Sequence, residues 1–266
     1  MLERFAAALV LTVPGTAVAQ AVQCSVPAQI PRPRLETEAA NEARRFVPIG
    51  GYTMALSWSP QYCLDSRGVD SAFQCSGRNG RFGFVLHGLW PEGAGSEWPQ
   101  YCRAADLLPR QIIRQNLCVT PSVQLLQHEW AKHGSCMATK PDLYFNLSRA
   151  LYQSVRYPDM TALSRRNRLT VGEFAAAFAR ANPRLRPSMI SVRTVRGNRL
   201  SEVWLCMDRA MEFARCPARQ RGAKATSLLF IESGPGMSSS KKRISSPARR
   251  PGLILTLDPN AQAPAD

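Results

Sequence analysis

Cysteine content is the feature that most constrains how this chain can fold. Eight cysteines lie beyond an N-terminal segment that resembles a secretory signal, and no two of them form a Cys-x-x-Cys pair. An even number of cysteines in an exported chain indicates disulfides formed in an oxidising compartment. Zinc sites built from thiolates usually need a closely spaced pair, which is missing here. We therefore expect four disulfides, although the sequence alone allows about a hundred pairings.

The first 19 residues have the organisation of a signal peptide. Arg4 precedes an apolar run over residues 6–13, and Ala17-Val18-Ala19 is a small-x-small cleavage site before Gln20. The run is too short to span a bilayer, so a membrane anchor is not expected. An N-terminal helix of the fold is the alternative. We expect residues 1–19 to be removed and the product to be periplasmic or secreted.

The rest of the chain divides by composition into three parts. Residues 20–48 are rich in proline, alanine and charge and read as a leader that Cys24 ties down. Residues 49–233 are long enough for one domain with a sizeable core. Residues 234–266 form a basic tail rich in serine and proline, which we expect to be disordered.

Hydrophobic periodicity predicts a mixture of strands and helices. Residues 52–58 alternate as a half-buried strand does, and residues 82–90 are apolar on both faces, which favours a strand in the centre of a sheet. Thr120 as N-cap and Pro121 at the first helical position predict a helix over 121–134. The pattern also predicts helices over 142–155 and 171–181, and strands over 189–195, 201–207 and 228–231.

Net charge points to a polyanionic partner. The chain has 34 basic and 19 acidic residues, for a formal charge of +15. A strong positive field raises the local concentration of a polyanion and its association rate. On charge alone, a basic surface that only keeps the protein soluble is the alternative.

The three histidines of the chain lie in two short segments, residues 84–91 and 128–136. Imidazole gives or takes a proton near neutral pH. At about 100° per residue, His128, Glu129, Lys132 and His133 share one face of the predicted helix. His87 interrupts an apolar strand. These groups together indicate acid–base catalysis at an anionic centre.

Two other hydrolase classes fit the residues poorly. A zinc protease motif His-Glu-x-x-His needs imidazoles four residues apart, and here Lys132 holds the fourth position. A cysteine protease needs a free thiol beside a base, whereas every cysteine has a predicted disulfide role. We expect no metal and no cofactor.

Two motifs, His87-Gly-Leu-Trp-Pro91 and His128-Glu-Trp-Ala-Lys-His-Gly-Ser-Cys136, resemble the active-site segments of the ribonuclease T2 family of secreted acid endoribonucleases. The resemblance extends over roughly residues 50–231 and includes Tyr144-Phe145 and the segment Glu202-Val-Trp-Leu-Cys206. It implies an α+β fold, in which helices flank a central antiparallel sheet, held by disulfides.

The resemblance also implies an activity. RNA would be cleaved without metal, by attack of a 2′-hydroxyl on its own 3′-phosphate, to a 2′,3′-cyclic phosphate that water opens to a 3′-phosphate. DNA lacks that hydroxyl and would be bound without being cut. RNA is thus the expected partner, and we expect a monomer.

By the same resemblance, His133 is the base and His87 the acid, with their roles exchanged in the hydrolytic step. Lys132, His128 and Glu129 hold the phosphate and stabilise the transition state. Purely structural roles for these residues are the alternatives, such as bracing the helix or lying solvated at its surface.

Residues that contact the base are less defined. Trp90 either stacks on a base or fills the core, and Glu92 either accepts from a base amine or is solvated. Trp98 and Tyr101 are further candidates for stacking. No preferred base is predicted.

Family analogy pairs Cys102 with Cys136, which would hold both active-site segments in register. Short spacing suggests two local pairs, and the fourth follows by elimination: Cys63 with Cys75, Cys206 with Cys216, and Cys24 with Cys118. Two rival functions remain, a non-catalytic RNA- or polyanion-binding protein on the same fold and a metal-dependent nuclease or protease.

Overall fold

A computed structural model describes residues 24–38, 42–66 and 71–233, so the predicted signal peptide and the basic tail lie outside the described residues. Its elements follow this order along the chain: β1 (Ile49–Trp58), α1 (Ser59–Asp65), α2 (Ala72–Cys75), β2 (Phe84–Gly93), α3 (Arg110–Asn116), α4 (Val123–Glu129), the π-helix η1 (Trp130–Gly134), α5 (Ser135–Met137), α6 (Pro141–Ser154), α7 (Met160–Ser164), α8 (Val171–Ala181), η2 (Pro187–Met189), β3 (Ile190–Val195), β4 (Arg199–Met207) and η3 (Ala218–Gln220). The predicted α+β class is confirmed.

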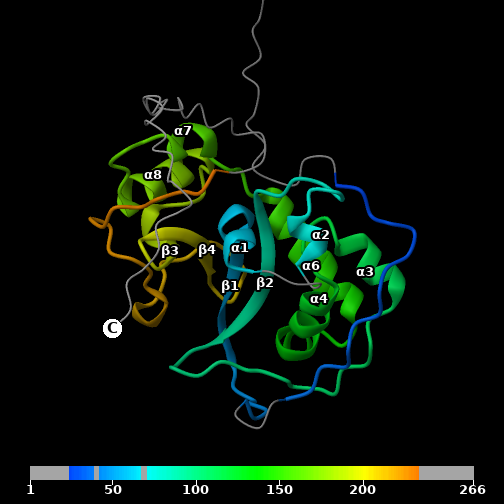
Figure 1. The fold of residues 1–266 in the computed structure, drawn as a ribbon. Coiled ribbons are helices and arrows are strands. Elements are labelled where there is room, and N and C mark those ends of the chain that lie inside the picture. The colour runs from blue at the N-terminus through cyan, green and yellow to red at the C-terminus, as the bar shows by residue number, and fades with distance from the viewer. Residues whose placement is uncertain (1–23, 39–41, 67–70, 234–266) are drawn as a thin grey trace, which may run out of the picture.

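The four strands form one antiparallel sheet in the order β2-β1-β4-β3. Strand side chains alternate between faces, and Leu56 lies opposite Leu86 on β2 and Val203 on β4. These apolar side chains are buried in a core completed by aromatic rings of α8. Figure 1 shows α3, α4 and α6 beside β2, with α7 and α8 on the side of β3. The other face of the sheet carries polar side chains, among them Ser57 on β1 and Glu202 on β4, which are hydrogen-bonded to each other.

Strand β2 lies at an edge of the sheet, so the prediction of a central position was wrong. Its backbone is nevertheless covered, because hydroxyl groups replace a neighbouring strand. Tyr144 in α6 bonds both the amide and the carbonyl of Leu89, and Tyr152 donates to the carbonyl of Phe84. Burial behind helices therefore explains the two-sided apolar pattern, and the edge position tolerates Pro91, which has no amide to donate.

The helix of the second motif begins and ends differently from the prediction. Ser122, not Thr120, is the N-cap of α4, and its hydroxyl accepts from the amide of Leu125. Thr120 instead donates to the carbonyl of Leu86. Helical structure also continues past Gly134 through α5.

Helices α6 and α8 lie where they were predicted, and Thr170 with Glu173 forms a capping box at the start of α8. Strands β3 and β4 are likewise confirmed. The strand predicted over 228–231 was wrong, because Leu228 and Phe230 make only isolated bridges. No helix among the described residues is long and apolar enough to cross a membrane.

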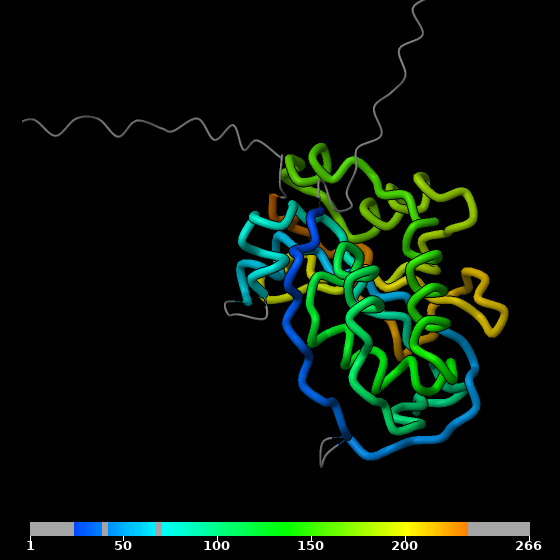
Figure 2. Tube along the Cα trace, turned by 90° about the vertical axis from the view of Figure 1, so that its right-hand side faces the viewer, coloured from blue at the N-terminus to red at the C-terminus, as the bar shows by residue number. Residues whose placement is uncertain are grey.

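All four predicted disulfides are present: Cys24–Cys118, Cys63–Cys75, Cys102–Cys136 and Cys206–Cys216. The bond between Cys102 and Cys136 joins the loop after β2 to α5. The bond at Cys24 anchors the leader, whose described residues run in blue along the outside of the helical layer (Figure 2).

We expect Leu56→Ala to lower the free energy of unfolding by about 2–5 kcal/mol, because its side chain is fully buried between two strands and the cavity would not fill. Leu64→Ala is the matched control, since Leu64 is 53% exposed, and its effect should stay within about 0.5 kcal/mol. Chemical denaturation with the disulfides intact measures both. Equal effects would contradict this assignment of the core.

Candidate active site

Strand β2 and the helical segment α4–η1 meet at one cleft of about 460 Å³. The strand contributes His87, Trp90 and Glu92, and the helical segment contributes the polar residues of the second motif. The cleft is lined by His87, Trp90, Pro91, Glu92, Ser96, Trp98, His128, Glu129, Lys132, His133, Arg193, Trp204, Arg219 and Gln220. All five residues predicted to be catalytic therefore share one cleft.

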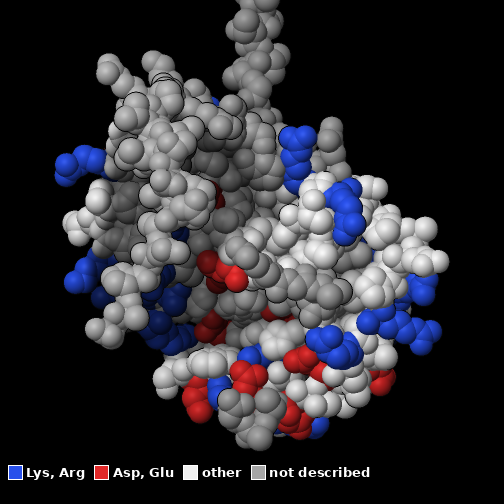
Figure 3. All heavy atoms as spheres, in the orientation of Figure 1, with Lys and Arg blue, Asp and Glu red and all other residues white. Residues whose placement is uncertain are grey.

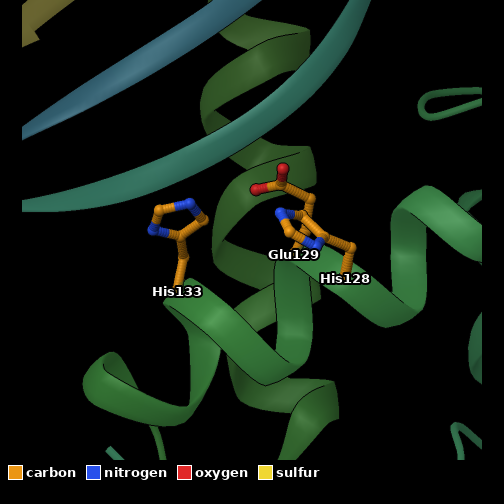
Figure 4. A group of neighbouring side chains, drawn as sticks. All are labelled: His128, Glu129 and His133. Atoms are coloured by element: carbon orange, nitrogen blue, oxygen red, sulfur yellow. The ribbon is translucent and has the colours of Figure 1, made fainter. Parts of the chain in front are cut away.

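The π-helix at Trp130–Gly134 sets the geometry of the helical side. A π-turn takes more residues than an α-turn, so residues five apart come close to alignment, and such turns are frequent at functional sites. His128 and His133 are five apart, and one nitrogen of each lies within 4.8 Å of the other and of a Glu129 oxygen. Figure 4 shows Glu129 and His133 rising from successive turns toward the strand above.

Glu129 is a buried carboxylate between the two segments. Its Oε2 accepts from the indole of Trp90 at 2.9 Å, and its Oε1 lies 3.6 Å from Nε2 of His87. Burial raises the pKa of Glu129, although the neighbouring charges of His87 and His128 oppose the shift. Oε1 is buried and has no hydrogen-bond partner among the described residues.

The neighbouring Gly88 makes room for that carboxylate. A Cβ atom at Gly88 would lie 1.8 Å from Oε2 of Glu129 and 2.6 Å from Nε1 of Trp90. Both contacts are far shorter than van der Waals separation, so no side chain fits here without moving Glu129.

His87 is held by a second carboxylate, Glu202 on β4. Nδ1 of His87 lies 2.7 Å from Oε1 of Glu202, which also accepts from Ser57, while Oε2 accepts from the indole of Trp204. A partner at Nδ1 fixes the ring and directs Nε2 into the cleft toward Glu129.

The carboxylates set the charge of His87. Burial by itself would lower the pKa of this imidazole, but the hydrogen bond to Glu202 and the charges of Glu129 and Glu202 outweigh it, so the pKa is raised. Glu202 is partly buried, which would raise its pKa, yet its bonds to His87, Ser57 and Trp204 lower that pKa to about 2. His87 is therefore suited to carry a proton.

His133 has the opposite environment. Its ring is buried, and burial together with the positive charges of Lys132 and His128 holds its pKa well below the ordinary value. Its Nδ1 is buried without a hydrogen-bond partner among the described residues. The pKa values of the two imidazoles in this cleft are thus shifted in opposite directions, as is typical of a base and an acid.

The leader supplies carboxylates to His128 and Lys132. Glu36 Oε1 lies 2.9 Å from Nδ1 of His128, and Glu42 Oε1 accepts from the ammonium of Lys132 at 2.7 Å. Neither Glu36 nor Glu42 lines the cleft, so both side chains are held from outside it. The sequence analysis treated the leader as a tether and did not anticipate these contacts.

Three of the four residues proposed to contact a base line the cleft. Trp90 packs between the rings of His87 and His133, and Trp98 is 41% exposed at the rim. Glu92 accepts from the hydroxyl of Thr53, and its burial raises its pKa. Tyr101 is not brought to the cleft, because its ring is buried and its hydroxyl donates to Glu42.

Several cleft residues lie outside the two motifs and were missed. Glu202 was noted only as part of a family-like strand, and no role was given to Trp204, Arg193, Arg219 or Gln220. Polar and aromatic residues at alternate positions of β4 were the available signal, because alternation places Glu202 and Trp204 on one face.

A divalent metal has possible ligands at His128, Glu129 and His133. Nδ1 of His128 is already bonded to Glu36, and one oxygen of Glu129 to Trp90, so each offers one remaining atom. Lys132 lines the same cleft. An ammonium beside the ligands disfavours a second cation and favours an anion such as phosphate.

Comparison with known proteins identifies the family. The model of the Ribonuclease T2 family matches residues 49–216. The chain belongs to the ribonuclease T2 family. It is 32% identical over 185 residues to a probable ribonuclease of Haemophilus influenzae, which covers 65% of this chain and 62% of that protein. It is 36% identical over 127 residues to a ribonuclease of Aeromonas hydrophila, covering 48% and 54%. The match thus spans less than two thirds of either relative.

Two solved structures share the fold. An RNase-related protein from Calystegia sepium superposes with a TM-score of 0.56 at 22% identity, over 69% of this chain and 97% of that one. RNase NT in complex with 5′-AMP gives a TM-score of 0.55 at 22% identity, over 69% and 98%. The superposed share of this chain is close to the extent of the family match.

We expect Gly88→Ala to reduce cleavage of RNA by about a hundredfold, because the added methyl group displaces Glu129 and misplaced catalytic groups are costly. Gly95→Ala is the control, since a Cβ there meets nothing within 4 Å, and it should cleave normally. Initial rates and thermal melting of both variants test this. Normal cleavage by a folded Gly88→Ala variant would show that the position of Glu129 is unimportant.

Proposed function

We propose that this protein is an exported, metal-independent endoribonuclease that cleaves single-stranded RNA through a 2′,3′-cyclic phosphate. The observation that carries the proposal is the pair of imidazoles, His87 and His133, which line one cleft with opposite shifts of pKa. Cleavage by a 2′-hydroxyl requires one group that takes a proton and another that gives one.

In the first step, neutral His133 takes the proton of the 2′-hydroxyl as its oxygen attacks the adjacent phosphorus. Protonated His87 gives its proton to the 5′-oxygen that leaves. Negative charge grows on the non-bridging oxygens, where Lys132 and His128 stabilise it. Glu129 lies beside the same phosphate, with Oε1 3.6 Å from Nε2 of His87, and burial makes its carboxylate easier to protonate than an exposed one.

In the second step the roles are exchanged. His87, now neutral, activates a water molecule, and His133, now charged, protonates the 2′-oxygen as the cyclic phosphate opens. The product is a 3′-phosphate. DNA has no 2′-hydroxyl and is bound without being cut.

The location follows from the disulfides and the signal-like sequence. All eight cysteines are paired, which suits an oxidising compartment, and two relatives come from Haemophilus influenzae and Aeromonas hydrophila. We place the protein in the periplasm, as a monomer and with no membrane contact, and RNA as its substrate.

A non-catalytic polyanion-binding protein is the second candidate, favoured only by the charge of +15. It gives no reason for a deeply buried carboxylate with an unpartnered oxygen, because phosphate binding alone is served by exposed cations.

Substitution of either imidazole tests the reaction. We expect His133→Ala and His87→Ala each to lower kcat by about 10²–10⁴-fold with little change in KM, because each loses one proton transfer. Product analysis should show the cyclic phosphate accumulating in the wild-type reaction. EDTA should leave the wild-type rate unchanged. Absence of cleavage by wild type and by both variants would support mere binding. Activity that EDTA abolishes and zinc restores would contradict the metal-independent mechanism.

The dependence of rate on pH follows from the two shifts. His133 must be neutral, and its pKa is lowered, so the rate falls only when the pH drops well below the ordinary imidazole value of about 6.5. His87 must be charged, and its pKa is raised, so the rate falls as the pH rises above that value. We expect a bell-shaped profile of kcat/KM whose plateau includes about pH 6.5. A profile that is flat from about pH 4 to 8 would contradict the two-imidazole scheme.

A further inference from the structure

We infer that Arg193, stacked on Trp204, binds the RNA phosphate that follows the leaving nucleotide. The cleft would then hold two consecutive phosphates, one at the histidines and one at β3. This inference rests on the proposed function, because it uses His87 as the group that protonates the leaving oxygen.

The cleft continues past His87 across the polar face of the sheet. Ser57 on β1 lies opposite Glu202 on β4, and Glu202 lies opposite Arg193 on β3. His87 is hydrogen-bonded to Glu202, so Arg193 lies one strand beyond the partner of the acid. Lys132 lies at the helical end of the same cleft.

A row of rings leads to the same place. The ring of Trp90 lies 5.1 Å from that of His87 and 5.2 Å from that of Trp204, centroid to centroid. The guanidinium carbon of Arg193 lies 4.1 Å from the Trp204 ring. These residues form a continuous wall, against which a single strand of RNA can lie.

The guanidinium of Arg193 is held in position, and no carboxylate of the described residues pairs with its charge. Stacking on Trp204 and a hydrogen bond from Nη1 to the carbonyl of Arg221 at 3.1 Å hold it in place. Its cross-strand carboxylate, Glu202, is engaged by His87. Within the described parts of the chain Arg193 forms no ion pair, whereas Lys132 pairs with Glu42 and Arg219 lies 3.9 Å from Glu92. Its charge is thus available to an anion.

The guanidinium of Arg193 favours phosphate as that anion. A guanidinium binds phosphate oxygens through two parallel hydrogen bonds, and pre-arrangement reduces the entropy lost on binding. The strand that leaves His87 carries its next negative charge on the following phosphate, toward β3. Figure 3 shows Lys and Arg side chains gathered on this β3–β4 side of the molecule, with acidic side chains below.

A pair of short substrates isolates this subsite. We compare a dinucleotide NpN with NpNp, which differs only in a 3′-terminal phosphate, and with pNpN, which carries the added phosphate at the other end. Wild type should cleave NpNp with a kcat/KM about ten- to a hundredfold above that for NpN, the range for a hydrogen bond to a charged group. Arg193→Gln should abolish the gain of NpNp over NpN, and its ratio of pNpN to NpN cleavage should equal that of wild type.

Arg196→Gln is the matched control. Arg196 is exposed in the turn between β3 and β4, does not line the cleft, and its substitution removes the same charge. It should keep the gain for NpNp. On longer single strands, Arg193→Gln should reduce the slope of log binding constant against log salt by about 0.7, the value for one lost phosphate contact.

Three results would overturn the inference: no gain for NpNp in wild type, a gain that persists in Arg193→Gln, or an equal loss in Arg196→Gln. Failure of wild type to cleave NpN would instead reject the proposed function. The affinities of 2′-O-methyl dinucleotides with and without the 3′-phosphate then test the subsite independently, because binding of these analogues does not require cleavage. Tighter binding of the phosphorylated form, lost in Arg193→Gln, would support it, and equal binding would reject it.

Discussion

The hydrogen bond between His87 and Glu202 is the main contact that makes the pKa of His87 differ from that of His133. His87 has a carboxylate at Nδ1 and a second one near Nε2, and both favour its charged form. His133 is buried beside cations and has no such partner among the described residues. One imidazole therefore holds a proton under conditions in which the other does not. In the proposed mechanism this asymmetry orients the RNA strand, with its 2′-hydroxyl at His133 on the helix and its leaving oxygen at His87 on the sheet.

His128 and Lys132 are also held by carboxylates. His128 is paired with Glu36 and Lys132 with Glu42, and both carboxylates come from the leader, which precedes the part of the chain matched by the family model. The disulfide at Cys24 holds the leader against the helical layer. His128 and Lys132 are thus held by carboxylates outside the cleft that both side chains line. The leader belongs to the site as well as to the fold.

Local sequence patterns predicted most helices and strands. The features that they did not predict depend on contacts between segments that are distant in the sequence. Helix α8 was predicted at its observed bounds from its amphipathic periodicity alone, and the structure adds a capping box at its start. The edge position of β2 could not be seen, because the hydroxyls of Tyr144 and Tyr152 that cover it lie more than 50 residues away in sequence. A periodicity of 100° per residue describes an α-helix and could not predict the π-turn at His133. Glu202 reaches His87 only because β4 pairs with β1 in the folded sheet.

The most direct test of this account is a titration of the imidazoles by NMR. The chain has three histidines, so three ring signals are followed, and a variant at each position assigns them. The account predicts that the pKa of His87 lies above the ordinary value of about 6.5 and that the pKa of His133 lies well below it. A pKa of His133 equal to or above that of His87 would contradict the assignment of base and acid.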